Sequence, residues 1–409
     1  MNLLASDNKG RIFDIRDLGP AGMKAGRFFS LPEREFIKLP AGSRLFMLPQ
    51  RAPVGHDPAT GEFKAVKNYF AVAAFISPAY TATYNSAYQE IKKPSMLPLF
   101  CYSACAFHRG GFYVTAVRVD KSDRHDPQSI DVNLVIKNVK KIKRMFSGNR
   151  LIRHLGDCAL AHGCPGAQNF FLSREECPLP VSPRCNASCA GCISIQTQPR
   201  IKFVPTPEEI AETALFHAGE VRDPVLSFGQ GCEGEPLLQS AVIEKSIRLI
   251  RRATDKGTIN INTNASLPEA IGRLFDAGLD SVRVSMNSAR GEYYNRYYKP
   301  KGYSFKDVMK SINTAKRKNG FVSVNYLTMP GFTDSRDEFA AFRKFVESRH
   351  IDMIQWRNLN FDPRHYFKIM KLDVVSPNML GVRDIMNRLK RDFPRLRMGY
   401  YNPSLAKDI

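Results

Sequence analysis

The chain has 409 residues, of which 43% are apolar and 24% are charged. This composition argues against a disordered chain, and the length exceeds that of one ordinary compact domain, so two domains and a tail are expected. The net charge of +21 would attract RNA, DNA, nucleotides or an acidic partner.

Basic residues gather in three stretches, and no RNA-recognition or helix-turn-helix signature accompanies them. Solvated helix faces are therefore the competing interpretation. The chain turns polar after four residues, and its longest apolar run, near Phe70–Ile76, is too short to span a bilayer. We expect a soluble cytoplasmic protein. The basic stretches are Lys137–Arg153, Arg248–Lys256 and Arg388–Arg397.

The first 175 residues contain irregular strand-like runs separated by turns, followed by two basic helical patterns near 130–146 and 149–162. This mixture predicts an N-terminal α+β accessory domain over residues 1–175. The runs that read as strands are Glu35–Leu39, Arg44–Leu48, Phe70–Ile76 and Gly111–Val119.

From about Val204 the pattern becomes strand, loop and helix in repetition, which is typical of a parallel sheet covered by helices. Thr206 and Glu209 predict a capping box at the first of these helices. With a first strand near 180–184, six βα units result, too few for a full eight-fold barrel. We expect an α/β core, a partial (βα)6 TIM-type barrel, over residues 176–370. A C-terminal helix (about 376–392) and a basic tail would fill residues 371–409. The expected strands are 224–228, 258–262, 281–286, 322–327 and 352–357.

Nine cysteines, an odd number, argue against a disulfide framework and favour metal binding. Cys185, Cys189 and Cys192 have the spacing C-x3-C-x2-C. Three thiolates on one tight loop can hold three corners of a cubane and leave a fourth iron open to a ligand. A zinc knuckle or unrelated buried thiols are the alternatives, but zinc usually takes four ligands. The position at the end of the first strand of a βα series favours the iron–sulfur interpretation.

In these residues the chain resembles the radical SAM superfamily, over roughly 178–365. The resemblance implies an oxygen-sensitive [4Fe-4S] cluster on the three cysteines and S-adenosylmethionine (SAM) chelated to the fourth iron. It also implies reductive cleavage of SAM to a 5′-deoxyadenosyl radical that abstracts hydrogen from a substrate. A low-potential electron donor of the flavodoxin or ferredoxin type would be a partner. Gly191 departs from the family pattern, which usually has an aromatic residue before the third cysteine.

The resemblance also assigns SAM contacts. Gly234, Glu235 and Pro236 match the end of the GGEP motif that meets the SAM ammonium, with Glu233 in place of the first glycine. Helix capping and a structural salt bridge are the competing interpretations of the polar residues at the other strand ends. Those expected contacts are Asn264 (a position near SAM), Ser285 and Asn287 (ribose), Met329 (adenine) and Arg357 (SAM carboxylate or substrate).

Cys158, Cys164 and Cys177 are candidates for an auxiliary iron–sulfur cluster or zinc site, with the pair Cys101 and Cys105 as further cysteines in the preceding domain. Free cysteine is often a small buried hydrophobe, which is the alternative. His154 and His162 could also be metal ligands, but we interpret them as ordinary helix residues.

The leading function is thus a radical SAM enzyme of unknown reaction. Its substrate would be a nucleic acid or a phosphorylated metabolite, which the charge favours, or a peptide. The alternative is a non-catalytic iron–sulfur or zinc protein that senses redox state or binds nucleic acid. Glu235 and the polar strand ends discriminate between the two, because a pure binder would not need them. The sequence assigns no residue as substrate-side acid, base or radical relay.

Overall fold

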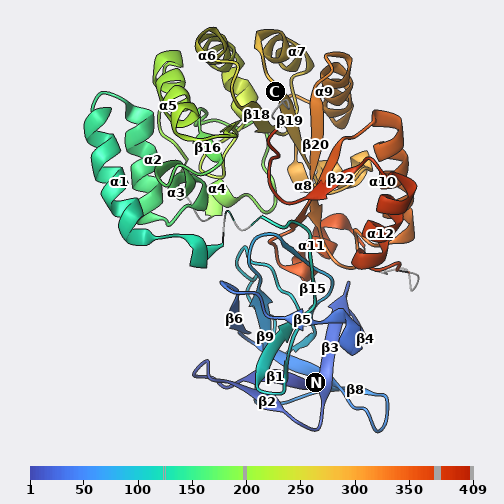
Figure 1. Ribbon diagram of the computed structural model, residues 1–409. Helices are drawn as coiled ribbons and strands as arrows, with labels where there is room; N and C mark the ends of the chain where they lie inside the picture. The colour runs from blue at the N-terminus through green and yellow to red at the C-terminus, as the bar shows by residue number, and fades with distance from the viewer. Residues whose placement is uncertain (123, 125, 197–199, 373–378, 406–409) are drawn as a thin grey trace.

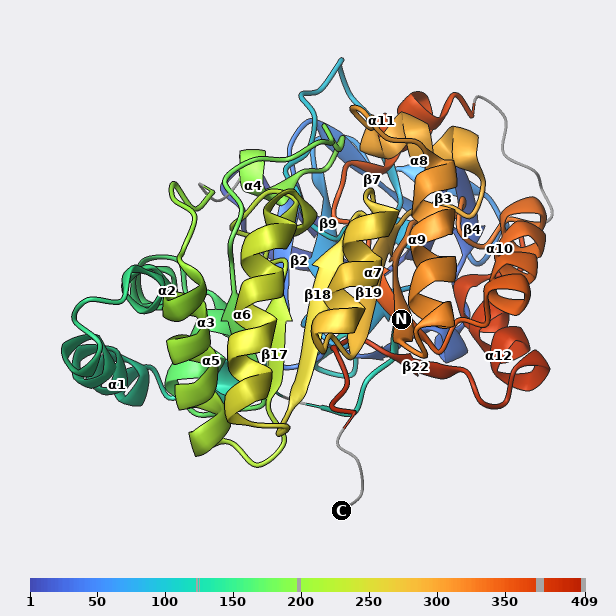
Figure 2. The same ribbon diagram turned by 90° about the horizontal axis from the view of Figure 1, so that it is seen from above.

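The computed structural model describes the chain except for residues 123, 125, 197–199, 373–378 and 406–409. An N-terminal part of antiparallel strands lies beneath an α/β core in Figure 1, and the helices of the core surround its sheet on the outside. The same helices are seen from above in Figure 2. No described helix has the length and apolar character that crossing a membrane requires.

The N-terminal part is built on two antiparallel sheets and a two-stranded ladder. The central strand β9 (Phe70–Phe75) is apolar along its length and pairs with β1 (Asn2–Ser6) and β6 (Arg44–Leu48). The remaining elements are β2 (Ile12–Ile15), β3 (Gly19–Lys24), β4 (Arg27–Ser30), η1 (Glu33–Glu35), β5 (Ile37–Lys38), β7 (Arg51–His56), β8 (Phe63–Ala65), β10 (Tyr80–Ala82), β11 (Asn85–Ser86), β12 (Tyr88–Glu90), β13 (Cys105–His108), β14 (Gly111–Val114), β15 (Ala116–Arg118) and η2 (Pro127–Ser129).

Three helices connect this part to the sheet of the core: α1 (Val132–Met145), α2 (Arg150–Ala161) and α3 (Pro165–Phe171). The side chains of Asp131 and Asn149 cap the first two by accepting hydrogen bonds from backbone N–H groups. Their buried apolar residues belong to the hydrophobic cluster of the core strands and not to the two clusters centred on the N-terminal strands. The packing therefore groups α1–α3 with the core, although a boundary near residue 175 was expected from the sequence.

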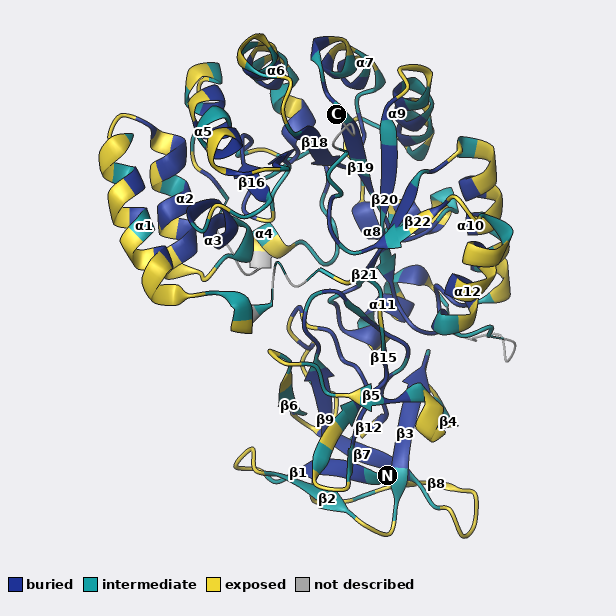
Figure 3. Ribbon diagram, in the orientation of Figure 1, coloured by how far each residue is buried: buried dark blue, intermediate teal, exposed yellow. Residues whose placement is uncertain are grey.

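The core sheet has its strands in sequential order, each parallel to the next. The helices turn buried faces to the sheet and exposed faces outward, as Figure 3 shows, and the buried faces are apolar. The strands are β16 (Glu176–Leu179), β17 (Val225–Phe228), β18 (Thr258–Thr263), β19 (Ser281–Met286), β20 (Phe321–Thr328), β21 (Met353–Asn358) and β22 (Arg397–Gly399). The helices are α4 (Ile193–Gln196), α5 (Pro207–Glu220), η3 (Pro236–Gln239), α6 (Ser240–Ala253), α7 (Pro268–Ala277), α8 (Gly291–Tyr298), α9 (Phe305–Arg317), α10 (Arg336–Arg349), α11 (Pro363–Met370) and α12 (Val382–Asp392).

The partial barrel expected from the sequence is confirmed, with differences in detail. The first strand is β16, a few residues before the expected 180–184, and Thr206 and Glu209 form the expected capping box. The expected basic tail contains a seventh strand, β22, which pairs with β21. Short helices α8 and α11 were missed, because eight residues give a weak periodic signal. The expected start of the last helix near 376 lies outside the described residues.

The segment after β22 enters the interior of the barrel. Asn402 is buried, and its amide nitrogen donates to Glu176 Oε1 (3.4 Å) and Ser227 Oγ (3.2 Å). Its amide oxygen accepts a hydrogen bond from Gln355 Nε2 at 3.0 Å. Asn402 thus joins β16 and β17 to β21 across the open side of the sheet. These four polar residues are stable in the interior because they satisfy one another.

The N-terminal part contacts the core at the carboxyl ends of β20 and β21. Two buried ion pairs cross the contact, Lys24–Asp334 at 2.7 Å and Arg51–Asp362 at 3.3 Å. Asn358, at the end of β21, accepts from the backbone N–H of Ala82 at 2.8 Å. Since ligands of open α/β sheets bind at strand carboxyl ends, the N-terminal part lies where it limits access to a site there.

Candidate functional site

The loop that carries Cys185, Cys189 and Cys192 follows β16 and rests on helix α8. Backbone N–H groups of Ser188 and Ala190 donate to carbonyl oxygens of α8, at 3.0 and 2.9 Å. These contacts fix the backbone, while the three cysteines stay partly exposed and free of disulfides. The loop therefore presents three thiols from a rigid base at the end of a strand.

The three thiols lie close enough to act on one another. Burial raises the pKa of Cys189, and the neighbouring Cys185 and Cys192 raise it further. The guanidinium of Arg200 lies 3.8 Å from Cys192 Sγ, and Ser194 Oγ lies 3.3 Å from the same sulfur. An iron–sulfur cluster binds thiolates, and its positive irons favour loss of the thiol protons. Three thiols on one loop beside the cation of Arg200 can supply such thiolates. The donor set thus fits an iron–sulfur cluster.

Gly191 has no room for the aromatic side chain that the family pattern places there. A Cβ at this position would lie 2.8 Å from the Tyr297 hydroxyl and 3.2 Å from the ring of Phe361. Both rings belong to segments distant in sequence, and Tyr297 is buried on α8. Aromatic contact at this point of the loop is therefore made by other parts of the chain.

The loop after β17, residues 229–236, runs beside the approach to the cysteines. The backbone N–H groups of Gly234 and Glu235 donate to Ser182 O (2.7 Å) and Arg184 O (2.8 Å). A Cβ on Gly234 would lie 1.9 Å from Arg184 O, so only glycine permits this approach. The expected motif and the cysteine loop are thus held together through the backbone.

Glu233, which replaces the first glycine of the motif, has a structural role. Its buried carboxylate accepts backbone N–H bonds from Val181 (2.8 Å), Ser182 (2.9 Å) and Gln230 (2.6 Å). Burial raises its pKa to about 7. The sequence marked this position as a departure from the motif but did not reveal that its side chain ties the two loops together.

Glu235 is also buried, and burial raises its pKa to about 7. Its carboxylate accepts from the Thr263 hydroxyl and from the backbone N–H groups of Leu237 (3.0 Å) and Asn264 (2.9 Å). It therefore fixes the end of β18 against the loop, while Pro236 begins η3. The contact of this motif with SAM stays a prediction.

Asn264 lies at the end of β18 and faces the cysteine loop. Its amide nitrogen donates to Asn186 Oδ1 (2.8 Å), and the amide nitrogen of Asn186 donates to Ser266 Oγ (2.9 Å). Asn186 stands between the first two cysteines. Hydrogen bonds thus link the end of the third strand to the cysteine loop through Asn186, a residue that the sequence analysis did not single out.

Ser285 and Asn287 lie in different surroundings. Ser285 is partly exposed on β19, whereas Asn287 is fully buried just after it. The amide nitrogen of Asn287 donates to Tyr293 O (3.3 Å) and Tyr366 Oη (3.2 Å), against α8 and α11. In the described part of the chain its Oδ1 has no hydrogen-bond partner. The ribose role remains a prediction for both residues.

Met329 contacts the N-terminal part of the chain, and Arg357 contacts the segment that follows β22. Met329 is buried, with Asn85 Nδ2 at 3.7 Å from its sulfur, so the N-terminal part covers it. The guanidinium of Arg357 lies 3.8 Å from the centre of the Tyr400 ring. Their predicted contacts with SAM are untested.

The inner face of β19–β21 is polar and partly exposed, whereas β16–β18 are buried at every position. Arg283, Ser285, Asn325 and Arg357 alternate with buried apolar residues that face the helices. Burial and, second to it, the charge of Arg357 lower the pKa of Arg283 to about 9. Among the described residues, the Nε atoms of both arginines have no hydrogen-bond partner.

Arg283 is a site residue that the sequence analysis missed. The sequence indicates its position, because polar and apolar residues alternate in SVRVSM (281–286), which places Arg283 and Ser285 on one face of the strand. The only side-chain hydrogen bond found for it in the described structure goes from a terminal nitrogen to Gln355 Oε1, at 3.2 Å. Two adjacent guanidiniums inside a barrel repel each other, so an anionic ligand between them would stabilise both.

The remaining cysteines separate into two kinds. Cys158 is grouped with Cys232 and His154, and Cys177, expected in this set, is not among them. Cys164 lies beside Cys158, since its N–H donates to Cys158 O at 3.2 Å. Cys101 and Cys105 are buried in the N-terminal part, where burial raises the pKa of each thiol to about 12. These last two are protonated core residues.

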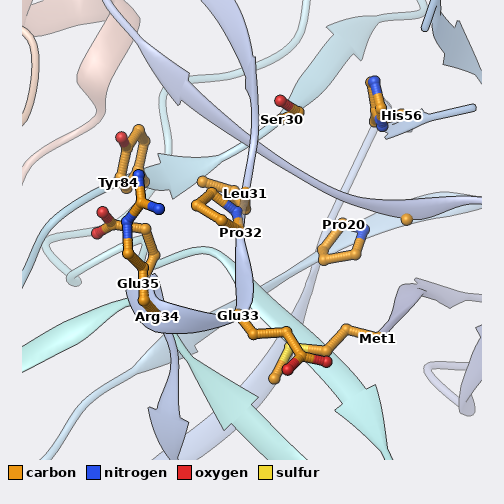
Figure 4. A pocket seen from close by; sticks show the side chains of 11 residues that line it. Met1, Pro20, Ser30, Leu31, Pro32, Glu33, Arg34, Glu35, His56 and Tyr84 are labelled. Atoms are coloured by element: carbon orange, nitrogen blue, oxygen red, sulfur yellow. The ribbon is translucent and has the colours of Figure 1, made fainter. Parts of the chain in front are cut away.

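A hollow of about 590 Å³ lies in the N-terminal part (Figure 4). Its lining includes Pro20, Glu33, Arg34, His56 and Tyr84, and all its lining residues come from the first 84 positions. None of them is a cysteine or belongs to the core sheet. The hollow is therefore separate from the site at the strand ends.

Comparison with known proteins agrees with this geometry. Residues 179–343 match the sequence model of the Radical SAM superfamily. This segment contains the cysteine loop, the 229–236 loop and strands β17–β20. This segment of the chain is similar to the radical SAM superfamily of enzymes. The similarity implies a [4Fe-4S] cluster and SAM as cofactors.

Two curated relatives are similar over part of their length. The FeMo cofactor biosynthesis protein NifB of Klebsiella pneumoniae is 25% identical over 46% of this chain and 46% of the relative. The GTP 3′,8-cyclase of Aquifex aeolicus (strain VF5) is 27% identical over 52% of this chain and 63% of the relative. The chain thus spans about half the length of the curated relatives it matches. Among solved structures, methylornithine synthase (PylB) aligns with a TM-score of 0.39 and 14% identity, over 67% of this chain and 76% of that one.

Proposed function

We propose that the chain holds a [4Fe-4S] cluster on Cys185, Cys189 and Cys192 and binds SAM beside it, over the 229–236 loop. When bound, these cofactors supply reductive cleavage of SAM to methionine and a 5′-deoxyadenosyl radical, which takes a hydrogen atom from the substrate. The observation that carries the proposal is the direct backbone pairing of Gly234 and Glu235 with the approach to the cysteines. A non-catalytic metal protein would not need this arrangement.

The residues around the cysteines have positioning roles in this proposal. Glu233 and Glu235 hold the loop rigid, so that its backbone carbonyls can accept from the SAM ammonium. Asn264 fixes the cysteine loop through Asn186. Ser285 and Asn287 would bind the ribose, Met329 the adenine, and Pro236 would set the end of the loop. Rigid support of this kind favours a reproducible ligand geometry.

We further propose that the substrate is a small anion, such as a phosphorylated or carboxylated metabolite. Arg283 and Arg357 face the partly exposed interior of the barrel with unpaired Nε atoms in the described structure. Arginine binds phosphate and carboxylate through paired N–H donors. The N-terminal part at the strand ends favours a small substrate over a duplex or a folded protein.

The basic stretches do not argue for a nucleic-acid substrate. They lie largely on the outward faces of α1, α6 and α12, where Lys140, Arg252 and Arg388 are exposed. Solvated helix faces account for them. The charge would still favour an acidic electron donor, and we propose a low-potential flavodoxin or ferredoxin type.

The direct experiment is anaerobic reconstitution followed by dithionite and SAM, with 5′-deoxyadenosine as the readout. The intact chain is expected to form it, and a Cys185→Ala variant is the matched control. Absence of 5′-deoxyadenosine from a fully loaded chain would contradict the enzyme and favour the redox-sensing alternative.

The substrate class is tested with the same preparation. A panel of phosphorylated and carboxylated metabolites should include one that raises 5′-deoxyadenosine formation, and Arg283→Gln should abolish that increase while slow formation without substrate continues. An Arg248→Gln variant, changed at an exposed residue of α6, is the control. Stimulation by bulk RNA or by peptides instead would contradict the small-anion substrate.

A further inference from the structure

His154, Cys158 and Cys232 form a compact group away from the cluster loop. Their ligand atoms all lie within 4.8 Å of one another, and Cys158 Sγ is 3.5 Å from His154 Nε2. His154 and Cys158 are four residues apart on α2 and so share one helix face. Cys232 comes from the loop after β17. Both cysteines are buried, while the histidine is partly exposed.

We propose that this group binds a single Zn²⁺ ion. Zinc bonds of about 2.3 Å to sulfur and about 2.0 Å to nitrogen place two ligands of one tetrahedral ion about 3.5–3.8 Å apart. The Cys158–His154 separation of 3.5 Å fits such an edge. In a cubane each thiolate binds a different iron, so its ligands stand farther apart than those of one ion. The imidazole and two thiolates are also a typical zinc donor set.

A structural zinc site is normally closed by four protein ligands. Cys164 is the fourth ligand in this proposal. It lies just before α3, and its backbone N–H donates to the carbonyl of Cys158 at 3.2 Å. Its side chain stands outside the tight group of three, so it would have to move toward the ion on binding. Cys177, buried in β16, is not required.

The position of the site suggests a structural role for the ion. Cys232 directly precedes Glu233, Gly234 and Glu235, and its carbonyl accepts from the N–H of Ile201 at 2.8 Å. The ion would therefore fasten α2 to the 229–236 loop and to the segment that leaves the cysteine loop. Its influence on SAM binding rests on the proposed function, whereas the binding of the ion does not.

Metal analysis of the full chain tests the proposal without any measurement of activity. In a variant with Cys185, Cys189 and Cys192 all changed to alanine, about one zinc per chain is expected to remain after dialysis. Further change of Cys158→Ser or Cys232→Ser should lower it at least tenfold, and Cys164→Ser should weaken retention against a competing chelator. Cys101→Ala, at a buried cysteine of the N-terminal part, is the matched control and should retain the ion. Co²⁺ in place of zinc should show the visible bands of a tetrahedral thiolate site.

Three results would overturn the proposal. The first is iron with sulfide in the triple variant, which would mean a second cluster. The second is a Cys158–Cys232 disulfide, and the third is no metal with freely titrating thiols. If Cys158→Ser or Cys232→Ser fails to fold, His154→Ala replaces it, because that side chain is partly exposed. In a His154→Ala variant that keeps Cys185, Cys189 and Cys192, loss of zinc with normal iron loading would separate this inference from the proposed cluster.

Discussion

The chain has two groups of cysteines that differ in how they are assembled. Cys185, Cys189 and Cys192 lie within eight residues on one loop and are partly exposed. Cys158 and Cys232 are buried and come from a helix and a loop 74 positions apart along the sequence. An exposed group on one loop can offer an open metal position to a ligand. A buried group from two elements is suited to holding those elements together.

The largest effect is expected at the exposed group. Cys189→Ala should remove the cluster, because two thiolates on this loop cannot replace three. Iron should fall from about four atoms per chain to near zero, and 5′-deoxyadenosine should disappear. Zinc at the buried group should be unchanged. Elemental analysis after anaerobic reconstitution is the measurement, and retention of half the iron or more would count against the assignment.

The next effect concerns the buried group and appears in stability. Removal of its ion by a strong chelator should lower the melting temperature by roughly 3–5 °C, as expected for a loss of about 3 kcal/mol. Calorimetry of the triple cysteine variant isolates the effect from the cluster. The Cys232→Ser variant should show no further fall when the chelator is added. An identical fall in that variant would show that the chelator acts elsewhere.

Glu233 lies between the two groups and should make stability depend on pH. Its folded pKa is about 7, above the ordinary value of 4.5, so between these values the folded chain keeps a proton that the unfolded chain releases. The free energy of unfolding therefore falls as pH rises from about 4.5 to 7 and levels off above, by up to about 3 kcal/mol. Glu233→Gln should flatten this slope in denaturation curves measured across that range, and an unchanged slope would contradict the role of Glu233.

The smallest effect tests the support of the exposed group. Gly191→Ala should lower stability by about 1–2 kcal/mol, because the new methyl group meets the Tyr297 hydroxyl. Tyr297→Phe removes that hydroxyl and should recover part of the loss when the two changes are combined. A double-mutant cycle by chemical denaturation measures the coupling. Simple additivity would mean that the loop does not rest on α8 as described.

The two groups also show what the sequence could reveal. The C-x3-C-x2-C loop and the motif at Gly234 were predicted because their residues are neighbours in the chain. Cys232 was not predicted as a partner of Cys158, because only the fold brings it there, and His154, four residues before Cys158 on the same helix, was interpreted as an ordinary helix residue. Likewise, the strand–helix rhythm predicted the barrel, whereas the seventh strand β22 is three residues long and polar at its start. Arg283 was visible in the alternation of its strand, but its unpaired Nε depends on neighbours from two other strands.

Asn402 has a consequence for the order in which the protein can be made. It pairs with Glu176, 226 positions earlier. At about 5–20 residues per second, a ribosome needs roughly 10–45 s to travel between them. During the later part of that interval, β16, the cysteine loop and β17 have been synthesised, while Asn402, the polar partner of Glu176 and Ser227, has not. A nascent chain therefore offers its thiols to iron donors, or to oxygen, before the barrel interior is complete.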